Sequence, residues 1–405
     1  MTRSRLINVL RDAAWLDRGR VAAWGAGLLI LETALLAYLT LWQTGFLFKV
    51  EVPTSIDFVS FYAAGKLVLA GTPALAYDRP THYLAQQLAT VPGGQYQFFF
   101  YPPVFLLLCA GLASLPYIVA YALFEAVTLA LFLGVIRRVL QAKDWTWLPA
   151  VLAFPAIFWN LGEGQNAFLT AALFGGFTLL IDRRPTLAGL LLGMMCYKPH
   201  FGMLAPFALI AGRRWRAFLA ASVTTVLLVG LSILLFGWET WAAYFRAFSV
   251  SDAVYASGRV DFEGMITPFG AFRLLGFQPG TSYVGQAVVA LLMAGLTVVV
   301  WRRSRRPALR NASLLAATLL SVPLALVYDQ LLLLVAIAWL VRDARETGFM
   351  PWEKILLLGC YAASLLIWIV GRAWQIPIGA FISAVVLSLC LRRIWLMPEQ
   401  PNVAR

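Results

Sequence analysis

The sequence has too few charged residues for a soluble protein of its size. Lys, Arg, Asp and Glu make up 13% of its 405 residues, whereas 61% are hydrophobic. A soluble globular domain carries about 25% charged and about 45–50% apolar residues. Because a soluble chain of this composition could not cover its surface with polar groups, the sequence predicts an integral membrane protein.

Other absences argue against metal and nucleotide chemistry. The sequence has only two histidines, which are too few for a histidine-rich metal site. Its four cysteines lie in apolar segments without C-x-x-C spacing, so we interpret them as core residues. There is no P-loop and no nucleotide-binding G-x-G-x-x-G motif. We therefore expect no cofactor and no metal, and a substrate reached from the membrane or its outer face.

Long apolar runs predict about twelve transmembrane helices, because a spanning helix needs about 20 apolar residues. Several of these runs are short, and the pair at 186–198 and 200–212 could instead be re-entrant without changing the remaining topology. We expect a single all-α membrane domain over residues 1–405. The predicted spans are 21–46, 117–136, 147–161, 165–182, 186–198, 200–212, 216–236, 281–301, 308–322, 325–341, 353–371 and 374–392.

The distribution of Lys and Arg predicts the orientation, because short cytoplasmic loops carry an excess of cations. Alternation from a cytoplasmic N-terminal arm places 24 of the 32 cations and both termini inside. The run 101–115 would reverse this pattern if it crossed, so we interpret it as a partly sunken helix that begins at Pro102 and Pro103. The net charge of +13 then collects beside anionic inner lipids and predicts no nucleic-acid partner.

Two long segments are predicted on the outer side, 47–116 with interfacial or re-entrant helices and 237–280. In the first, residues 57–70 have helical periodicity. Phe58, Phe61, Leu67 and Leu69 form its apolar side, which suits the membrane interface. Asp57 stands at the start of this helix. It could simply cap the helix, as aspartate often does, or take part in chemistry.

Two further polar positions lie at the outer ends of predicted spans. Residues 160–166 form a tight turn in which Gln165 and Asn166 could bind a polyol or only face the interface. Lys198 ends a short apolar helix. It could hold a phosphate at the lipid boundary, or its side chain could snorkel to water.

Three acids lie within predicted spans: Glu32, Glu125 and Asp329. Ionisable residues at membrane depth are functional candidates, although each could pair with a cation or stay protonated. The most polar interruption is Tyr328-Asp329-Gln330, which could form a substrate site or a structural hydrogen-bond cluster.

The order of these features resembles glycosyltransferase family 87, whose members are polytopic enzymes of the GT-C superfamily that use polyprenyl-phosphate sugars. The resemblance covers residues 50–220 well and the remainder by hydropathy. It is carried by Asp57-Phe58, Tyr62-Ala63-Ala64, Gly71, Tyr77-Asp78, Tyr101-Pro102-Pro103, Gly164-Gln165-Asn166, the block from Leu187 to Gly193, Lys198, Pro206, and the segment from Arg213 to Ala217.

The resemblance implies an inverting transfer of a hexose, usually mannose, from a polyprenyl-phosphate donor to a lipid-linked or envelope glycan. The reaction would occur on the outer face of a bacterial plasma membrane. Asp57 would be the base that takes the proton of the acceptor hydroxyl. Lys198 is the first candidate to bind the donor phosphate, and His200, Arg259 and Lys66 are weaker ones. The candidate substrate-binding residues are Tyr62, Asp78, Tyr101, Gln165, Asn166, Tyr328 and Asp329.

Two other functions stay open. A transporter or flippase of a lipid-linked saccharide would use Glu125 and Asp329 as pathway acids, but the sequence shows none of the paired repeats common in transporters. A scaffold subunit would tolerate alanine at Asp57 and Lys198. No residue identifies the sugar.

Overall fold

The computed structural model describes residues 3–41, 56–90, 93–256 and 261–397, and these residues form helices and connecting loops without a β-strand. Short 3-10 helices join several of the α-helices: η1 (Pro73–Tyr77), η2 (Pro103–Phe105), η3 (Met194–Tyr197), η4 (Pro199–Gly202), η5 (Phe262–Gly264) and η6 (Val327–Asp329). The α-helices are α1 (Arg3–Asp12), α2 (Arg18–Leu41), α3 (Phe58–Leu69), α4 (Arg79–Ala89), α5 (Leu106–Ala113), α6 (Tyr117–Leu140), α7 (Leu148–Leu152), α8 (Pro155–Glu163), α9 (Ala167–Leu180), α10 (Pro185–Gly193), α11 (Ala205–Ala211), α12 (Trp215–Phe236), α13 (Trp238–Ala256), α14 (Pro268–Leu274), α15 (Pro279–Arg303), α16 (Pro307–Ser321), α17 (Gln330–Thr347), α18 (Glu353–Trp374) and α19 (Ile378–Leu396).

Six of these helices are long and apolar enough to cross a membrane: α2, α6, α12, α15, α18 and α19. They correspond to six of the predicted spans, although residues 42–46 of the first span lie outside the described part of the chain. The other six predicted spans are also helical, but they are short, interrupted by 3-10 turns or, in α17, charged at one end. The all-helical membrane fold is therefore confirmed, whereas the number of twelve spans stays a prediction.

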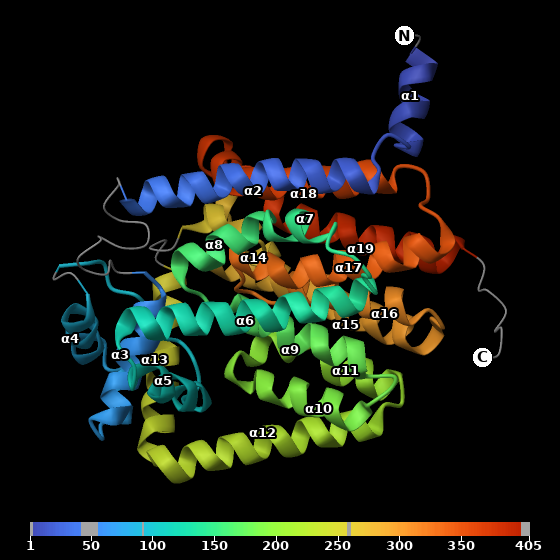
Figure 1. Cartoon of the computed structure of the whole chain (residues 1–405). Coiled ribbons are helices and arrows are strands. Elements are labelled where there is room, and N and C mark those ends of the chain that lie inside the picture. Colours follow the sequence, from blue (N-terminus) through green and yellow to red (C-terminus); the bar gives the residue numbers. More distant parts are fainter. Residues whose placement is uncertain (1–2, 42–55, 91–92, 257–260, 398–405) are drawn as a thin grey trace.

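The long helices run in one direction and its reverse, so the molecule has two distinct ends (Figure 1). Helices α3, α4, α5 and α13 gather at the left end of that view. At the right end lie α1 and the end of α19. Contacts join the segments of this second end: Lys354 donates to the carbonyls of Ala13 and Leu16, and Arg345 donates to that of Leu140. Loops predicted to share one side of the membrane thus meet at one end.

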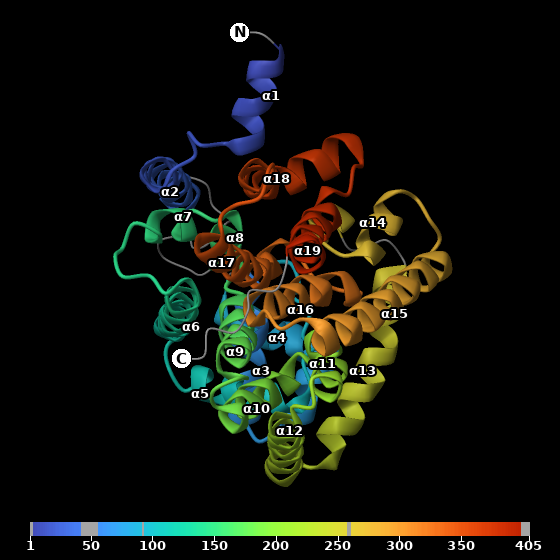
Figure 2. The same cartoon turned by 90° about the vertical axis from the view of Figure 1, so that its right-hand side faces the viewer.

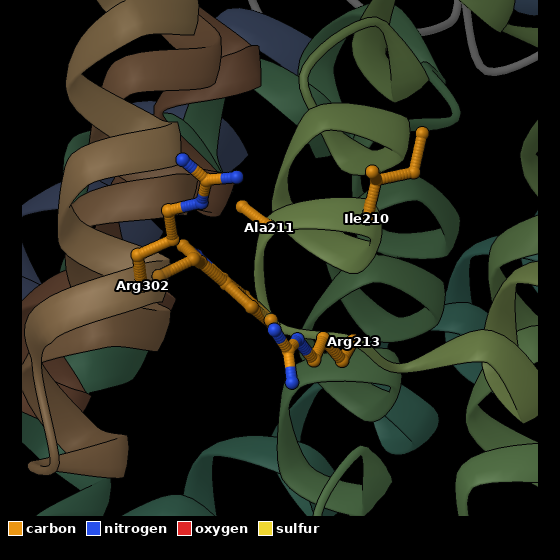
Figure 3. Close-up of a pocket in the computed structure, with 6 residues that line it drawn as sticks. Ile210, Ala211, Arg213 and Arg302 are labelled. Carbon is orange, nitrogen blue, oxygen red and sulfur yellow. The ribbon is translucent and has the colours of Figure 1, made fainter.

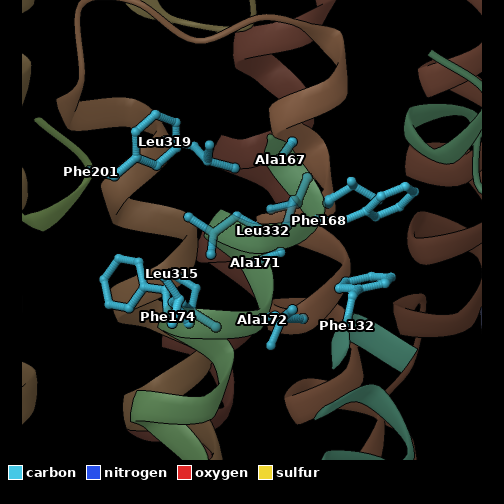
Figure 4. Packing of buried hydrophobic residues seen from close by; sticks show 14 of the residues in the cluster. Phe132, Ala167, Phe168, Ala171, Ala172, Phe174, Phe201, Leu315, Leu319 and Leu332 are labelled. Carbon is cyan, nitrogen blue, oxygen red and sulfur yellow. The ribbon is translucent and has the colours of Figure 1, made fainter. Parts of the chain in front are cut away.

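The centre of the molecule is formed by α9, α16 and α17, most of whose side chains are buried. Figure 4 shows Phe168 and Phe174 of α9 among Leu315 and Leu319 of α16 and Leu332 of α17. Outer helices have the opposite character. On α12, for example, Leu234 is 81% exposed. Such apolar outer surfaces suit contact with lipid and agree with an integral membrane protein.

The run 101–115 forms η2 and α5, with Pro102 as N-cap and Pro103 as the first helical residue. The prediction that these prolines begin a helix is confirmed. At 1.5 Å per residue, the eight residues of α5 extend about 12 Å. Helix α5 is therefore too short to cross a membrane by itself, as expected for a sunken segment.

The helix predicted at 57–70 is confirmed as α3, but the expected placement of its aromatic side chains is wrong. Phe58 and Phe61 are fully buried, and their rings pack on Tyr117, Tyr121, Phe124, Tyr101 and Phe105. The aromatic part of the apolar side of α3 therefore faces protein, not the membrane interface, whereas Leu69 at the end of the helix is exposed. Close approach of α5 at Gly65 permits this packing, because any side chain there would collide with the carbonyl oxygen of Cys109.

We expect Gly65→Ala to lower the free energy of unfolding by about 1–3 kcal/mol, the usual cost of overpacking a core. Gly111→Ala on α5 is the matched control, because a methyl group there meets no atom within 4 Å. Thermal unfolding in detergent measures both variants. Equal midpoints for Gly65→Ala and wild type would contradict the tight contact between α3 and α5.

Candidate active site

Asp57 precedes α3 but does not cap it. Its backbone is itself helical (φ −55°, ψ −31°) and its side chain makes no capping hydrogen bond. Instead, the carboxylate Oδ2 accepts a hydrogen bond of 2.7 Å from Nε2 of Gln165, a residue 108 positions away. The capping interpretation is therefore wrong, and the carboxylate belongs to a tertiary contact.

The turn between α8 and α9 presents Gln165 to Asp57. It begins at Gly164, which has a left-handed backbone (φ 65°), and any Cβ at this position would lie 2.6 Å from Cβ of Phe58. Only glycine therefore lets the turn lie directly on α3. The Gln165 Oε1 atom accepts hydrogen bonds from the Tyr101 hydroxyl (3.3 Å) and the Asn166 N–H (3.2 Å). These bonds leave the amide nitrogen facing Asp57.

Lys198 forms a buried ion pair with Asp329. Its Nζ atom lies 2.7 Å from Oδ1 of Asp329 and donates to Oδ1 of Asn166 at 3.3 Å. The residues are 6% and 3% exposed, respectively. The second carboxylate oxygen of Asp329 accepts from the N–H of Leu326 at 3.0 Å. The interpretation that Lys198 snorkels to water is therefore wrong. Of the three acids within predicted spans, Asp329 is the one for which the described residues show a cation partner.

The Asp57–Gln165 contact and the Lys198–Asp329 ion pair belong to one hydrogen-bond network, which we call the Asp57 network. They are joined because Asn166, the neighbour of Gln165, accepts a hydrogen bond from Lys198. Tyrosine rings border this network. The rings of Tyr101 and Tyr197 are stacked with centroids 6.5 Å apart, and the ring of Tyr328 lies 6.0 Å from Nζ of Lys198. The network thus combines α3, the turn after α8, the η3–η4 junction and η6.

Glu163 adds a second carboxyl group that the sequence interpretation missed. It accepts a hydrogen bond from the backbone of Asp57. Burial and, secondly, the charge of Asp57 raise the pKa of Glu163 to about 8. Burial also raises the pKa of Asp57, opposed by the hydrogen bond from Gln165 and the charge of Lys198. Burial and the neighbouring Asp57 carboxyl group therefore both favour the protonated form of Glu163.

Comparison with protein families matches residues 99–328 to the model of glycosyltransferase family 87. The chain belongs to this family. The resemblance inferred from the sequence motifs is thereby confirmed, and the protein is a membrane glycosyltransferase. No curated protein and no solved structure gives a match. The matched segment includes the turn after α8, Lys198 and Tyr328, while Asp57 and Asp329 lie outside it.

Several candidate residues of this family 87 enzyme lie apart from the Asp57 network. The Tyr62 hydroxyl donates to the carbonyl of Leu115 at 2.9 Å, and Lys66 is exposed beside the Tyr62 ring. Asp78 caps α4 through the N–H of Thr81. These three side chains thus have local roles. His200, by contrast, lies close to the network, because it packs on Phe201, whose ring is 4.7 Å from Nζ of Lys198. Arg259 lies outside the described residues.

The other acids within predicted spans have different surroundings. Glu125 accepts a hydrogen bond of 2.9 Å from Asn160, whose oxygen accepts the N–H of Ala167 at 3.0 Å. This buried pair fixes the turn after α8 to α6, and so supports the position of Gln165. Glu32 is half-buried on α2.

A pocket of about 470 Å³ lies at the other end of the enzyme, between α11 and the end of α15 (Figure 3). Its lining includes Ile210, Arg213, Trp301 and Arg302, and none of the residues of the Asp57 network. We therefore do not assign it to the transfer reaction.

Proposed function

We propose that this glycosyltransferase moves a mannose-like hexose from a polyprenyl-phosphate donor to a lipid-linked or envelope glycan acceptor. Asp57 is the base of the reaction. The observation that supports this role is the hydrogen bond from Gln165, which fixes the carboxylate without engaging it in helix capping. A base held in one orientation by a second residue is the arrangement that proton abstraction requires.

In the proposed step, the acceptor hydroxyl gives its proton to Asp57 while its oxygen attacks the anomeric carbon. The bond from that carbon to the donor's phosphate oxygen breaks, and its electron pair stays with the phosphate. The anomeric configuration inverts. Because the leaving polyprenyl phosphate is a stable anion, it needs charge stabilisation more than protonation.

Lys198 is the leading candidate for this stabilisation, because its charge already acts on Asp57. Asp329 offsets part of that charge across 2.7 Å. We therefore propose two roles for Lys198. It holds the side chains of Asn166 and Asp329 in place, and it provides positive potential near the phosphate of the donor. A protonated Glu163 favours donor binding, because it adds no second negative charge beside Asp57.

We propose that the Asp57 end faces outward from a bacterial plasma membrane, with both termini in the cytoplasm. The loops rich in arginine belong to the opposite end (Figure 1), and such loops usually remain in the cytoplasm. Donor and acceptor would then meet at the outer leaflet.

Proteoliposomes with a labelled polyprenyl-phosphate sugar and a glycolipid acceptor test the proposed activity. We expect a new labelled glycoside. Movement of the unchanged donor between leaflets, without a product, would favour the transporter and contradict the proposed reaction.

The transfer rate is expected to depend on pH through both carboxyl groups. The value of kcat/KM should rise as Asp57 loses its proton, at a pH above the usual range for aspartate because burial raises its pKa. It should fall above about pH 8, where Glu163 ionises and repels the donor phosphate. Glu163→Gln stays neutral and should abolish this fall. An unchanged alkaline fall in Glu163→Gln, with Asp78→Asn as the control, would contradict the role of Glu163.

A further inference from the structure

A larger cavity lies at the arginine-rich end, between α2, α7, α17 and α18. Its volume is about 810 Å³, within the usual range of ligand sites. Figure 2 shows these four helices grouped together. Helix α2 approaches α7 closely at Gly25, where any Cβ would lie 2.6 Å from Ala150. The cavity occupies the space that this contact leaves between α2 and the pair α17 and α18.

The cavity is apolar along most of its length. On α18 its lining runs from Lys354 to Leu365, and α2 contributes Val21, Trp24 and Leu28 at helical spacing. The eleven helical steps from Lys354 to Leu365 rise about 16 Å, which is about half of the roughly 30 Å hydrocarbon core of a bilayer. The cavity therefore has the depth of one membrane leaflet.

Four cations line the charged end of the cavity: Arg18, Lys143, Arg345 and Lys354. Backbone carbonyls hold two of them, since Lys354 donates to Ala13 and Leu16, and Arg345 donates to Leu140. Within the described part of the chain, no ion pair includes any of the four. Their positive charge is thus not neutralised by direct ion pairs.

Two acids, Asp17 and Asp144, also line this end of the cavity, and both accept local hydrogen bonds. Asp17 accepts the N–H of Arg20, and Asp144 accepts from Thr146. Other cations of the same end are neutralised: Arg310 binds Asp182, and Arg393 binds Glu353. Four cations against two acids leave this end of the lining with an excess of two positive charges. A cationic end above an apolar cavity is complementary to a lipid that has an anionic headgroup.

We propose that this cavity binds an anionic phospholipid of the adjacent leaflet. Its phosphate would lie among Arg18, Lys143, Arg345 and Lys354, and an acyl chain would extend between α2 and α18 toward Leu365. Basic pockets between transmembrane helices bind anionic headgroups in this way. The inference concerns the end opposite to Asp57 and does not depend on the proposed reaction.

Native mass spectrometry of the full-length protein tests this site with phosphatidylglycerol and phosphatidylcholine of equal chain length. We expect phosphatidylglycerol to bind more tightly. Lys143→Gln with Arg345→Gln should weaken its binding about thirtyfold, which corresponds to about 2 kcal/mol. Arg183→Gln with Arg184→Gln is the matched control, because it removes two exposed cations of the same end outside the cavity lining.

Ala362→Trp provides an independent test, since it fills the apolar part of the cavity and keeps all four cations. It should lower the retention of phosphatidylglycerol to that of phosphatidylcholine. Three results would each overturn the proposal. The wild type could bind the two lipids equally, the two double variants could lose phosphatidylglycerol binding to the same extent, or Ala362→Trp could retain phosphatidylglycerol fully. Binding of soluble glycerol phosphate as strong as that of the lipid would also overturn it.

Discussion

Replacing Asp57 with asparagine is expected to lower kcat/KM for sugar transfer by about 10²–10⁴-fold, the usual contribution of a general base. Asparagine has nearly the same shape, and its side-chain oxygen can still accept the hydrogen bond from Gln165. It cannot take the acceptor's proton. Stability should be unchanged or slightly higher, because burial disfavours the Asp57 carboxylate and the side chain does not cap α3. Transfer assays and thermal unfolding on the same preparation separate the two effects.

Asp78→Asn is the matched control for this substitution. Asp78 is also an acid at a helix start of the outer segment, but it caps α4 and is exposed. Asparagine caps helices about as well as aspartate, so both activity and stability should remain. Undiminished transfer by correctly inserted Asp57→Asn protein would remove Asp57 from the reaction.

Replacing Lys198 with methionine is expected to have the largest effect on stability. It leaves Asp329 buried without its cation, and breaking a buried ion pair costs about 3–5 kcal/mol. Transfer should also be lost. Lys66→Met serves as the control, since Lys66 is exposed and lies beside the Tyr62 ring. Unfolding in detergent measures both variants, and wild-type stability of Lys198→Met would contradict the buried pair.

The double variant Lys198→Met with Asp329→Asn separates folding from chemistry. No unpaired charge remains, so most of the lost stability should return. We expect transfer to stay impaired, because the positive potential near the donor phosphate is gone. Recovery of both stability and activity would limit Lys198 to a structural role.

The sequence predicted the helices well, because long apolar runs and their charged ends are local features. It misplaced the aromatic side of α3. Periodicity indicates that Phe58 and Phe61 lie on one side, but lipid and protein interior are both apolar. Only tertiary structure distinguishes them, through the close contact at Gly65.

The candidate site was predicted in part. Asp57, Gln165, Asn166, Lys198 and Asp329 were each singled out as polar residues in apolar surroundings. Their connections could not be predicted, because Lys198 and Asp329 are 131 residues apart and meet through 3-10 turns that interrupt the helices. Glu163 was not singled out, although its place in the same turn as Gln165 was a signal.

The direct displacement that we propose is tested most directly by the anomeric configuration of the product. A single carboxylate base and no covalent intermediate require a product of opposite configuration to the donor. Coupling constants in the NMR spectrum of the purified glycoside measure this. We predict inversion. A product with retained configuration would indicate a sugar–enzyme intermediate and contradict Asp57 as the base.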